Sequence, residues 1–391
     1  MKKLIMAAIM ILSLSVITLG QAKKIVGNTT INDAGTDIQR SIVLGVKAVN
    51  KFGDAPSGVQ TTSTDIWDRA DATPTQQIWV APTAARVHYI EGNALDVPSV
   101  GTLTFAGNPG DLDTIIIGSK TYVFDDTLEA VDGHVLIGAD SITSINNLVA
   151  AINLSDTAGT NYAAAMTSNA STAARSNATM LLYTTAATAT ATTETGDDLS
   201  WGAATTVVGT GAHTIRVYGL PTWSTTETYE DIAMMGTDSA TTTNSYVIIH
   251  RMKVLTKGDS LSNVGAITAT AGTDATITAV ILANRGQTLM AIYGVPSGET
   301  AYLKSWYGDI LKAQGGVATI EYSLLVNPEP DAQLTNFLTK SHRGVQSTGT
   351  SSGNWYYDPP MAFAGPCIIK VQGLGSGSDL DGSAGFNLIV E

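Results

Sequence analysis

Cysteine is almost absent from this sequence, which has Cys367 alone among 391 residues. An intramolecular disulfide and a zinc site built from several cysteines are therefore excluded. The flanking residues, PCIIKV, are mostly apolar and lack the cationic surroundings that make a thiol reactive. We therefore expect Cys367 to be a small buried side chain.

Charged residues are also scarce. They make up 14% of the chain, against roughly 25% in typical globular proteins, and Gly, Ala, Thr and Ser take their place. This composition is typical of β-rich extracellular or virion proteins. The net charge of −13 would repel a phosphate backbone, so we expect no nucleic-acid partner.

Long hydrophobic runs are missing except at the start of the chain. Residues 1–22 combine Lys2 and Lys3 with an apolar run of 16 residues, Leu4–Leu19, and a small-residue site at Gly20–Ala22. The run is shorter than the roughly 20 residues that a spanning helix needs. Two interpretations stay open, a cleaved secretory leader and a hydrophobic helix that packs in an assembly. We expect an N-terminal arm over residues 23–49.

Motifs that carry enzyme chemistry are missing too. The sequence has no GxxxxGK[ST] phosphate loop, no GxSxG elbow and no HExxH pair. Glycines at Gly373–Gly377 lack a strand–helix context and predict a flexible loop. We expect no catalytic residue and no cofactor, although a glycosidase built from two distant carboxylates stays open. The histidines are scattered and are expected at the surface or on sheet faces: His88, His134, His213, His250 and His342.

Two Asp-x-Asp pairs have a spacing found in calcium loops. They are Asp111 with Asp113, and Asp379 with Asp381. Neither continues to a full D-x-D-x-D-G…E loop, so we expect solvated turns and no metal site, with these four residues as the calcium candidates. Asp125–Asp126 and Asp197–Asp198 are expected to be surface pairs.

The remaining sequence is rich in strand signals. Beyond His213, about ten short apolar runs alternate with Gly, Pro, Asn and Ser turns, as in a β-sandwich or barrel. The clearest is Gly286–Ile310, where Leu289–Tyr293 and Thr300–Tyr307 flank a Pro296–Gly298 turn and predict a hairpin. We expect a mainly β fold with a sandwich or jelly-roll-like body, formed by residues 50–98 and 213–391.

Residues 99–212 differ from their flanking segments in composition and in their pattern of strand and helix signals. This difference predicts an inserted, acidic α+β domain. This segment holds 11 acidic and 2 basic residues, so it carries −9 of the net charge. Thr114–Ile117 and Lys120–Phe124 predict a hairpin. Asp140 or Ser141 can cap a helix that runs through Asn153. Its apolar face is expected to hold Ile142, Ile145, Val149 and Ile152.

Aromatic residues in the central hairpin are the candidates for an interface. Strand alternation would place Tyr302 and Trp306 in one facing set with Met290 and Ile292, and Tyr307 on the other side. Aromatic side chains are common anchors of protein interfaces. We therefore expect Tyr302, Trp306 and Tyr307 to contribute to self-association.

Several motifs together carry a resemblance. The body resembles a family of structural proteins of tailed bacteriophages, mainly marine podovirus-like phages, and the insert resembles a small module that recurs inside phage head and tail proteins. The motifs in the body are NKFGDAP, TSTDIWD, GAHTIRVYGLP, NSYVIIHRMKV, GQTLMAIYGVPSGETAYLKSWYGDI and SAGFNLIVE, and those in the insert are GTLTFAGNP and VLIGADSITSINNLVAAIN.

The resemblance implies a non-enzymatic virion component, a capsid decoration or head-fibre protein, with no catalytic residues to carry over. The implied partners are further copies of the chain in a homotrimer, the major capsid or tail proteins, and a host-surface glycan. A secretory leader does not fit a virion that assembles in the cytoplasm. Two alternatives therefore stay open, a secreted bacterial surface or filament subunit or adhesin, and a carbohydrate-binding tail protein.

Overall fold

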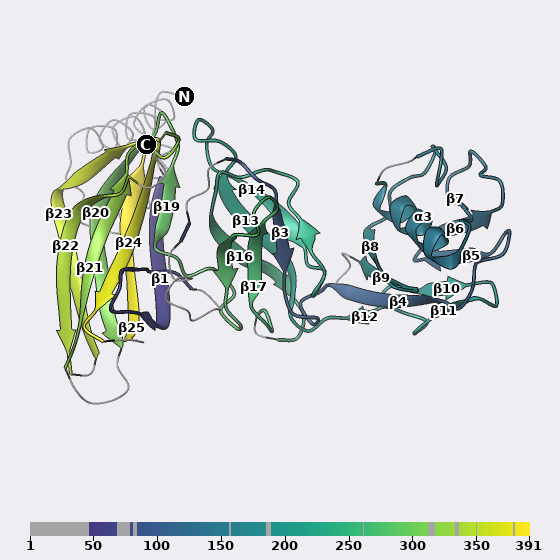
Figure 1. The fold of residues 1–391 in the computed structure, drawn as a ribbon, viewed down its shortest axis with the longest axis horizontal. Helices are drawn as coiled ribbons and strands as arrows, with labels where there is room; N and C mark the ends of the chain where they lie inside the picture. The colour runs from purple at the N-terminus through teal and green to yellow at the C-terminus, as the bar shows by residue number, and fades with distance from the viewer. Residues whose placement is uncertain are drawn as a thin grey trace, which may run out of the picture.

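The computed structural model describes residues 47–68, 79–80, 84–155, 158–184, 189–260, 262–311, 317–332, 336–348, 350–377 and 380–391. The expected leader, residues 1–22, and most of the expected arm lie outside the described residues. The fold is mainly β, as the sequence predicted. Three hydrophobic cores lie in a row along the molecule (Figure 1).

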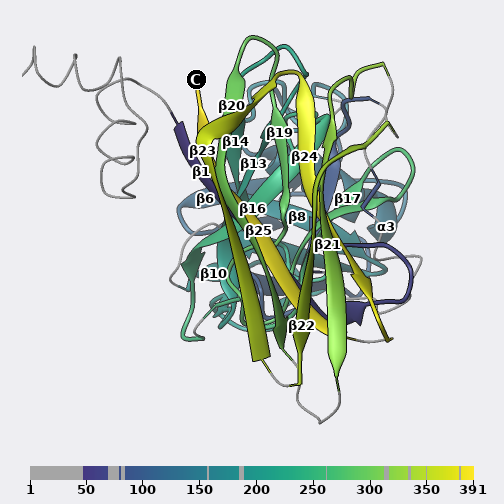
Figure 2. The same cartoon turned by 90° about the vertical axis from the view of Figure 1, so that its left-hand side faces the viewer.

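The first core lies between two antiparallel sheets, which form a β-sandwich (Figure 2). Side chains that alternate along each strand fill the space between the sheets. In order, one sheet contains β1 (Lys47–Val59), β25 (Leu380–Val390), β20 (Thr300–Leu311) and β23 (Thr350–Ala364). The other contains β19 (Ile292–Val295), β24 (Cys367–Gly375), β21 (Ala318–Asn327) and β22 (Leu338–Ser347), with β2 (Thr64–Asp65) paired to β24.

The central stretch, Gly286–Ile310, is not a hairpin. Its turn forms as predicted, with Gly298 at φ 85° and the Glu299 N–H bonded to the Pro296 carbonyl. The strands on either side belong to opposite sheets, since β19 pairs with β24 whereas β20 pairs with β23 and β25. The turn therefore carries the chain across the sandwich. The prediction failed because local patterning marks strands and turns without specifying their partners.

A β-bulge at Leu303–Ser305 also corrects the expected facing set. Both pairings of β20 shift register there, so the inward side of the strand changes parity. Leu303 and Trp306 both point into the core, whereas Tyr302 and Tyr307 are half-buried on the outer face. Tyr302 and Trp306 are thus on opposite faces, because the extra residue of the bulge reverses the alternation.

The second core lies between two smaller sheets. One is β14 (Thr228–Ala233), β13 (Ala212–Leu220) and β16 (Ile248–Lys257); the other is β15 (Ala240–Thr241), β3 (His88–Glu91), β17 (Ile267–Ala271) and β18 (Ile277–Ile281). Ile215 and Val217 are buried on one face of β13, as the strict alternation of apolar residues over Thr214–Tyr218 predicts from the sequence. The region expected to form one body therefore contains two separate cores.

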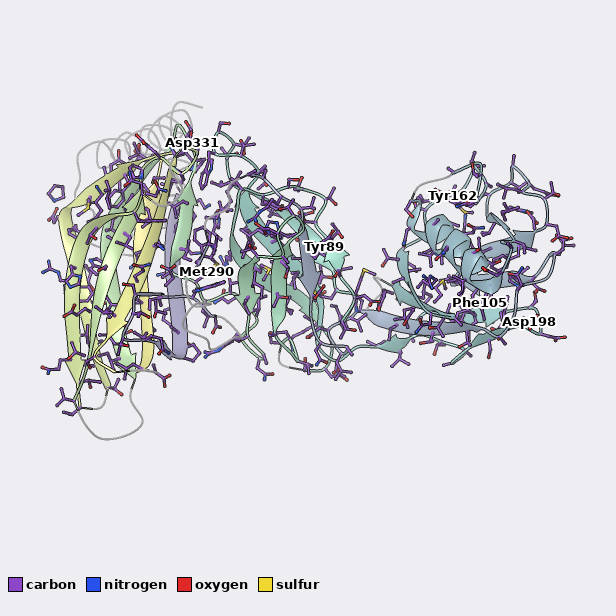
Figure 3. The ribbon with its side chains drawn as sticks, viewed as in Figure 1. Tyr89, Phe105, Tyr162, Asp198, Met290 and Asp331 are labelled. Atoms are coloured by element: carbon purple, nitrogen blue, oxygen red, sulfur yellow. The ribbon has the colours of Figure 1, made fainter. Side chains whose placement is uncertain are left out.

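The two sandwiches share one layer. In β19 all four residues are buried, because Tyr293 and Val295 contribute to the first core and Ile292 to the second. Met290 also joins the second core and lies between the two sandwiches (Figure 3). A side chain at Gly294 would meet Ile248 in β16 at 2.9 Å. This close packing fixes the sandwiches against each other.

The third core is built entirely from residues between Leu103 and Trp201, inside the expected insert. One sheet contains β10 (Thr192–Glu194), β5 (Thr114–Ile117), β6 (Lys120–Asp125) and β7 (His134–Leu136). The other contains β11 (Leu199–Trp201), β4 (Ser99–Phe105), β9 (Thr179–Thr184) and β8 (Ser171–Ser176), with β12 (Val207–Val208) beside β4. Phe105 and Tyr162 mark this core in Figure 3, and Asp198 lies at the far end of the insert.

Helix α3 (Ser141–Asn153) begins where the sequence predicted. The Asp140 carboxylate accepts from the Thr143 N–H at 2.7 Å and caps the first turn. The buried face is different from the expected one. Ile145 and Ile152 are buried, but Ile142 is 45% exposed, and Leu148 and Ala151 complete the face instead. Ile142 lies in the first turn, where the helix has not yet passed under the sheets.

Asp96 joins the two chain ends of the insert. Its fully buried carboxylate accepts from the N–H groups of Ala212 (2.7 Å), Val264 (2.8 Å), Gly265 (3.1 Å) and Asn93 (3.1 Å). The segment that enters the insert is therefore bonded to the segment that leaves it. Ala212 belongs to β13 and to the second core, so the body resumes one residue earlier than the sequence suggested.

Candidate functional site: the junction between the two sandwiches

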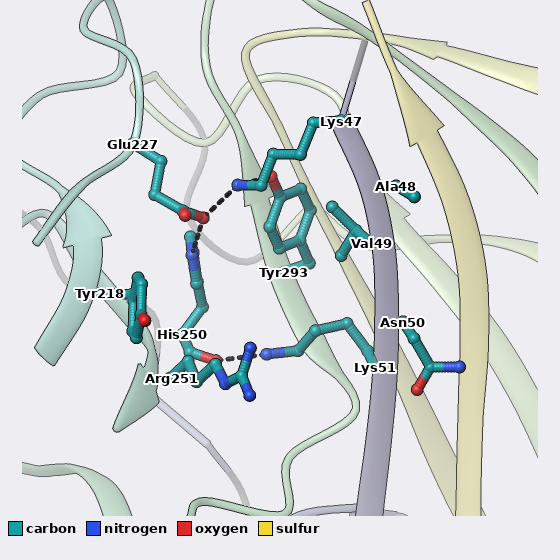
Figure 4. Close-up of a pocket in the computed structure, with 10 residues that line it drawn as sticks. All are labelled: Lys47, Ala48, Val49, Asn50, Lys51, Tyr218, Glu227, His250, Arg251 and Tyr293. Carbon is teal, nitrogen blue, oxygen red and sulfur yellow. Dashed lines mark hydrogen bonds and ion pairs between the residues drawn. The ribbon is translucent and has the colours of Figure 1, made fainter. Parts of the chain in front are cut away.

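The densest group of buried ionisable side chains lies where β1 of the first sandwich faces β16 of the second (Figure 4). A cavity of about 100 Å³ opens there, and a larger hollow of about 330 Å³ adjoins it along β1. Both are lined by Lys51 and Arg251. Lys47 and Lys51 are four residues apart on one strand, so the strand period of two places both on the same side.

Glu227 connects the two sandwiches through a short polar chain. Its carboxylate lies 2.5 Å from the Lys47 ammonium and 2.6 Å from His250 Nε2. Lys47 also donates to the Tyr293 hydroxyl at 3.1 Å. Burial alone would raise the pKa of Glu227, but the hydrogen bond and charge of His250, together with Lys47, outweigh it and lower the pKa. Glu227 is therefore an anion at neutral pH.

His250 is the buried neutral member of this chain. Burial lowers its pKa to about 4, against the opposing effect of Glu227. A neutral imidazole that bonds a carboxylate through Nε2 must carry its proton there, which leaves Nδ1 as the acceptor. Nδ1 has no hydrogen-bond partner in the described structure. The Tyr293 ring packs against the imidazole at 4.7 Å between ring centres and holds its orientation.

Lys51 is buried without a carboxylate partner among the described residues. Its side chain reaches across the junction and donates to the backbone carbonyl of His250. Burial, together with the charges of Arg251 and Lys47 and against the attraction of Glu227, lowers the pKa of Lys51 to about 7. The Lys51 amine therefore loses its proton much more readily than an exposed lysine does.

A second perturbed group lies further along the same junction, next to Asp54 of β1. Asp68 is 1% exposed, and neither of its carboxylate oxygens has a hydrogen-bond partner in the described structure. Burial raises its pKa to about 7, and Asp54 adds to this effect while Arg285 opposes it. Arg285 bonds Asp54 at 2.9 Å and so links the sandwiches on this side. The Leu289 carbonyl accepts from the backbone N–H groups of both Asp54 and Asp68.

This arrangement suits a structural junction better than a reaction centre. A lysine of lowered pKa and a carboxylate-oriented imidazole are both components of catalytic sites. Here the Lys51 amine is buried against a carbonyl, and no hydroxyl or thiol of the described residues bonds His250 Nδ1. The polar groups of the described residues at this site bridge the two sandwiches.

The three expected interface residues are divided between the core and the surface. Trp306 is fully buried in the first core, packs on Trp355 at 4.5 Å between ring centres and donates to the Tyr357 hydroxyl at 3.2 Å. Tyr302 and Tyr307 lie on the outer face of the same sheet. Tyr307 lies over Gly385, where a Cβ would meet its hydroxyl at 2.4 Å.

The outer face of this sheet is aromatic around Tyr307. Its ring stacks on Phe52 at 6.5 Å between centres, and Phe52 is 37% exposed. Tyr356, on the edge strand β23, is 78% exposed. This face therefore offers Phe52, Tyr307 and Tyr356 to a partner.

Of the calcium candidates, Asp111 and Asp113 lie in turns, whereas Asp381 lies in a strand. Asp111 accepts from the Asp126 N–H at 3.0 Å, and Asp113 accepts from the Gly110 N–H at 2.7 Å. Asp379 lies outside the described residues, and Asp381 is in β25. Within the described ranges, no group of three or more His, Cys, Asp or Glu side chains could hold a metal ion.

One expected surface pair is wrong. Asp125 is 3% exposed and bonds His134 Nδ1 at 2.6 Å, because β6 and β7 are neighbouring strands and His134 lies beside Val123, two residues before Asp125. Cys367 is buried, as predicted, and burial raises the pKa of its thiol to about 12. His88 and His213, at the two ends of the insert, are each buried with different partners, Thr242 and Gly209.

The insert has a polar hollow of its own, about 460 Å³ in volume. Hydroxyl and amide side chains dominate its lining: Ser119, Thr167, Ser168, Asn169, Thr184 and Thr190. Its one charged lining residue, Lys120, bonds Asp132 and Thr167. Such a lining presents many neutral donors and acceptors.

The residues of the junction were not found from the sequence. Lys47, Lys51, Glu227 and His250 are far apart along the chain, and no motif connects them. One signal was present, since Lys51 follows the apolar Val49 at an alternate position, and alternate residues of a strand share one face.

Comparisons with protein-family models, curated proteins and solved structures find no match. In the part of the chain that the structure describes, no helix is long and apolar enough to cross a membrane.

Proposed function

We propose that the chain is a non-enzymatic structural protein of a bacteriophage virion, a capsid decoration or head fibre. The observation that supports it most is the arrangement of three β-rich units in a row, with the first sandwich at one end and the acidic insert at the other (Figure 1). The first sandwich attaches and self-associates, while the insert projects outward. The layer that the two sandwiches share holds them rigidly together, as a spacer between the attachment end and the insert would require. The sequence resemblance to phage structural proteins also supports this role.

Self-association runs through the outer face of the first sandwich and yields a homotrimer. Phe52, Tyr307 and Tyr356 provide rigid aromatic contact area, which is typical of interface anchors. Burial of roughly 800 Å² on each partner would make such an interface specific. The major capsid or tail proteins are the further partners, and the localisation is the virion.

Sedimentation of the full chain tests the assembly. We expect a species three times the 40.6 kDa of one chain, and trimeric particles with outward projections in negative-stain images. A variant that lacks residues 99–210, bridged by a short Gly/Ser linker, should keep the same oligomeric state and lose the projections. A full-length chain that stays monomeric at micromolar concentration would contradict the homotrimer.

Carbohydrate binding is a second candidate for the insert alone. The polar hollow, with its hydroxyl and amide lining, favours a neutral glycan at this end of the molecule. Binding of host-surface glycans to the full chain, and its loss in the variant without residues 99–210, would support this role. Turnover of a glycan by the full chain would instead identify an enzyme and overturn the proposed non-enzymatic function.

A further inference from the structure

Strand β1 presents a free edge to the hollow between the two sandwiches. On one side β1 pairs with β25. The Asp54 N–H points the other way, since it donates to the Leu289 carbonyl. In an antiparallel strand, alternate residues direct both backbone groups to the same side. The backbone N–H and C=O groups of Phe52, Asn50 and Ala48 therefore share the free edge with Asp54.

These edge groups line open space. Ala48, Asn50 and Phe52 all line the hollow of about 330 Å³, and Gln287, Thr288 and Leu289 form the wall opposite. No backbone hydrogen bond occupies the three edge residues on that side among the described parts of the chain. Ala48 to Phe52 spans roughly 13 Å, enough for one short strand. An unpaired strand edge is a template for a further strand.

The hollow is basic in a chain whose net charge is −13. Arg251 bonds the neutral Gln287 side chain at 3.1 Å and lies over the Tyr218 ring. Lys51, at the back of the hollow, donates to a carbonyl. Neither cation has a carboxylate within ion-pair distance in the described structure. An incoming anion would therefore meet the Arg251 guanidinium, and its negative charge would favour the protonated form of the nearby Lys51 amine.

We propose that the hollow between β1 and β16 binds an extended acidic peptide, which adds as a strand to the free edge of β1. The edge groups of Ala48, Asn50 and Phe52 pair with its backbone, and carboxylate side chains of the peptide meet Arg251 and Lys51. This is β-strand addition, in which the backbone supplies affinity and the side chains supply specificity. The proposal does not depend on the virion role.

Fluorescence anisotropy with short labelled peptides tests the proposal on the full chain. Acetyl-VEVEV-amide should bind saturably, VQVQV about tenfold more weakly, and VKVKV not at all. Raising the salt concentration from about 50 mM to about 500 mM should weaken binding of the acidic peptide. Absence of binding at about 1 mM VEVEV, or equal binding of VEVEV and VQVQV, would overturn the proposal.

Two pairs of variants locate the site. Asn50→Pro removes one edge N–H and should weaken VEVEV binding about tenfold, whereas Asn50→Ala keeps the N–H and should bind normally. Arg251→Gln should also weaken binding about tenfold, while Lys253→Gln, two residues further along β16, should have little effect. If both members of either pair behave alike, the peptide binds elsewhere.

Hydrogen exchange provides a readout that needs no variant. In the wild-type chain, saturating VEVEV should slow exchange of the Asn50 and Phe52 amides, since these N–H groups enter the new ladder. Unchanged exchange at both amides would refute strand addition, even if Asn50→Pro fails to fold. Self-association of the wild type that Asn50→Pro abolishes would identify a second copy as the occupant and overturn the acidic-peptide assignment.

Discussion

Lys51→Met should stabilise the protein at neutral pH. The pKa of Lys51 falls from 10.5 to about 7 on folding, chiefly through burial. A difference of that size corresponds to a cost of about 4 kcal/mol at pH 7. Met fills a similar volume without charge, but leaves the His250 carbonyl without its donor, which costs about 2 kcal/mol. The expected net gain is therefore about 2 kcal/mol.

The pH dependence identifies the cause. Because the folded pKa is below the unfolded one, the unfolded chain binds more protons between pH 7 and 10.5. Stability of the wild type should therefore rise with pH across this window, by up to about 1.4 kcal/mol per pH unit from this group. Below pH 7, Lys51 is protonated in both the folded and the unfolded state, so the full cost of burying its charge remains. In Lys51→Met this contribution to the slope should disappear.

Urea unfolding at pH 6, 7, 8 and 9, followed by circular dichroism, measures the effect. Lys253→Met is the matched control, since Lys253 is exposed on the facing strand and should change neither stability nor slope appreciably. Equal slopes in the wild type and Lys51→Met would refute the burial argument. A loss of stability at pH 7 would show that the bond to His250 matters more than the buried charge.

Three further predictions concern other buried groups. Asp68→Asn should stabilise the fold by about 2 kcal/mol above pH 7 and have little effect below pH 4. The reason is that burial raises the pKa of Asp68 to about 7, so the wild type loses stability as the pH rises from about 4 to 7. Urea midpoints that shift equally at the two pH values would contradict this. Trp306→Ala should destabilise the monomer by about 4 kcal/mol, whereas Tyr307→Ala should weaken self-association by about 2 kcal/mol and leave the monomer folded. Sedimentation measures the self-association, and circular dichroism measures the folding of the monomer. Asp96→Asn should lower the free energy of unfolding by about 3 kcal/mol, because the new amide would direct its own N–H donors toward two of the four backbone N–H groups that now donate to the carboxylate. Asp259→Asn, at an exposed position, is the control. Equal thermal midpoints for the two variants would contradict the role assigned to Asp96.

Local features were legible in the sequence because neighbouring residues create them. The cap at Asp140 requires only a carboxylate before an apolar helical pattern. The turn at Gly298 requires only a glycine where φ is positive. Alternation in Thr214–Tyr218 likewise identified the buried face of β13. The mainly β fold class follows from the sum of such signals.

The sequence did not reveal which strands pair with one another, because strand pairing joins residues that are far apart in the chain. Lys47 pairs with Val390, and this closure of the first sandwich leaves no trace in either segment alone. For the same reason, Gly286–Ile310 was predicted to be a hairpin, whereas in the structure its two strands belong to opposite sheets. The bulge at Leu303–Ser305 then reversed the alternation that had grouped Tyr302 with Trp306.

The junction was decided by tertiary structure alone. Lys51 has an ordinary pKa in an extended chain, and burial against His250 together with the charges of Arg251 and Lys47 shifts it. His250 and Arg251 are brought to β1 by the packing of one sandwich on the other. The sequence therefore determined which segments become strands and where the chain turns, because these depend on adjacent side chains. Only the tertiary structure decided which charges lose their water, because that depends on contacts between segments some 200 residues apart.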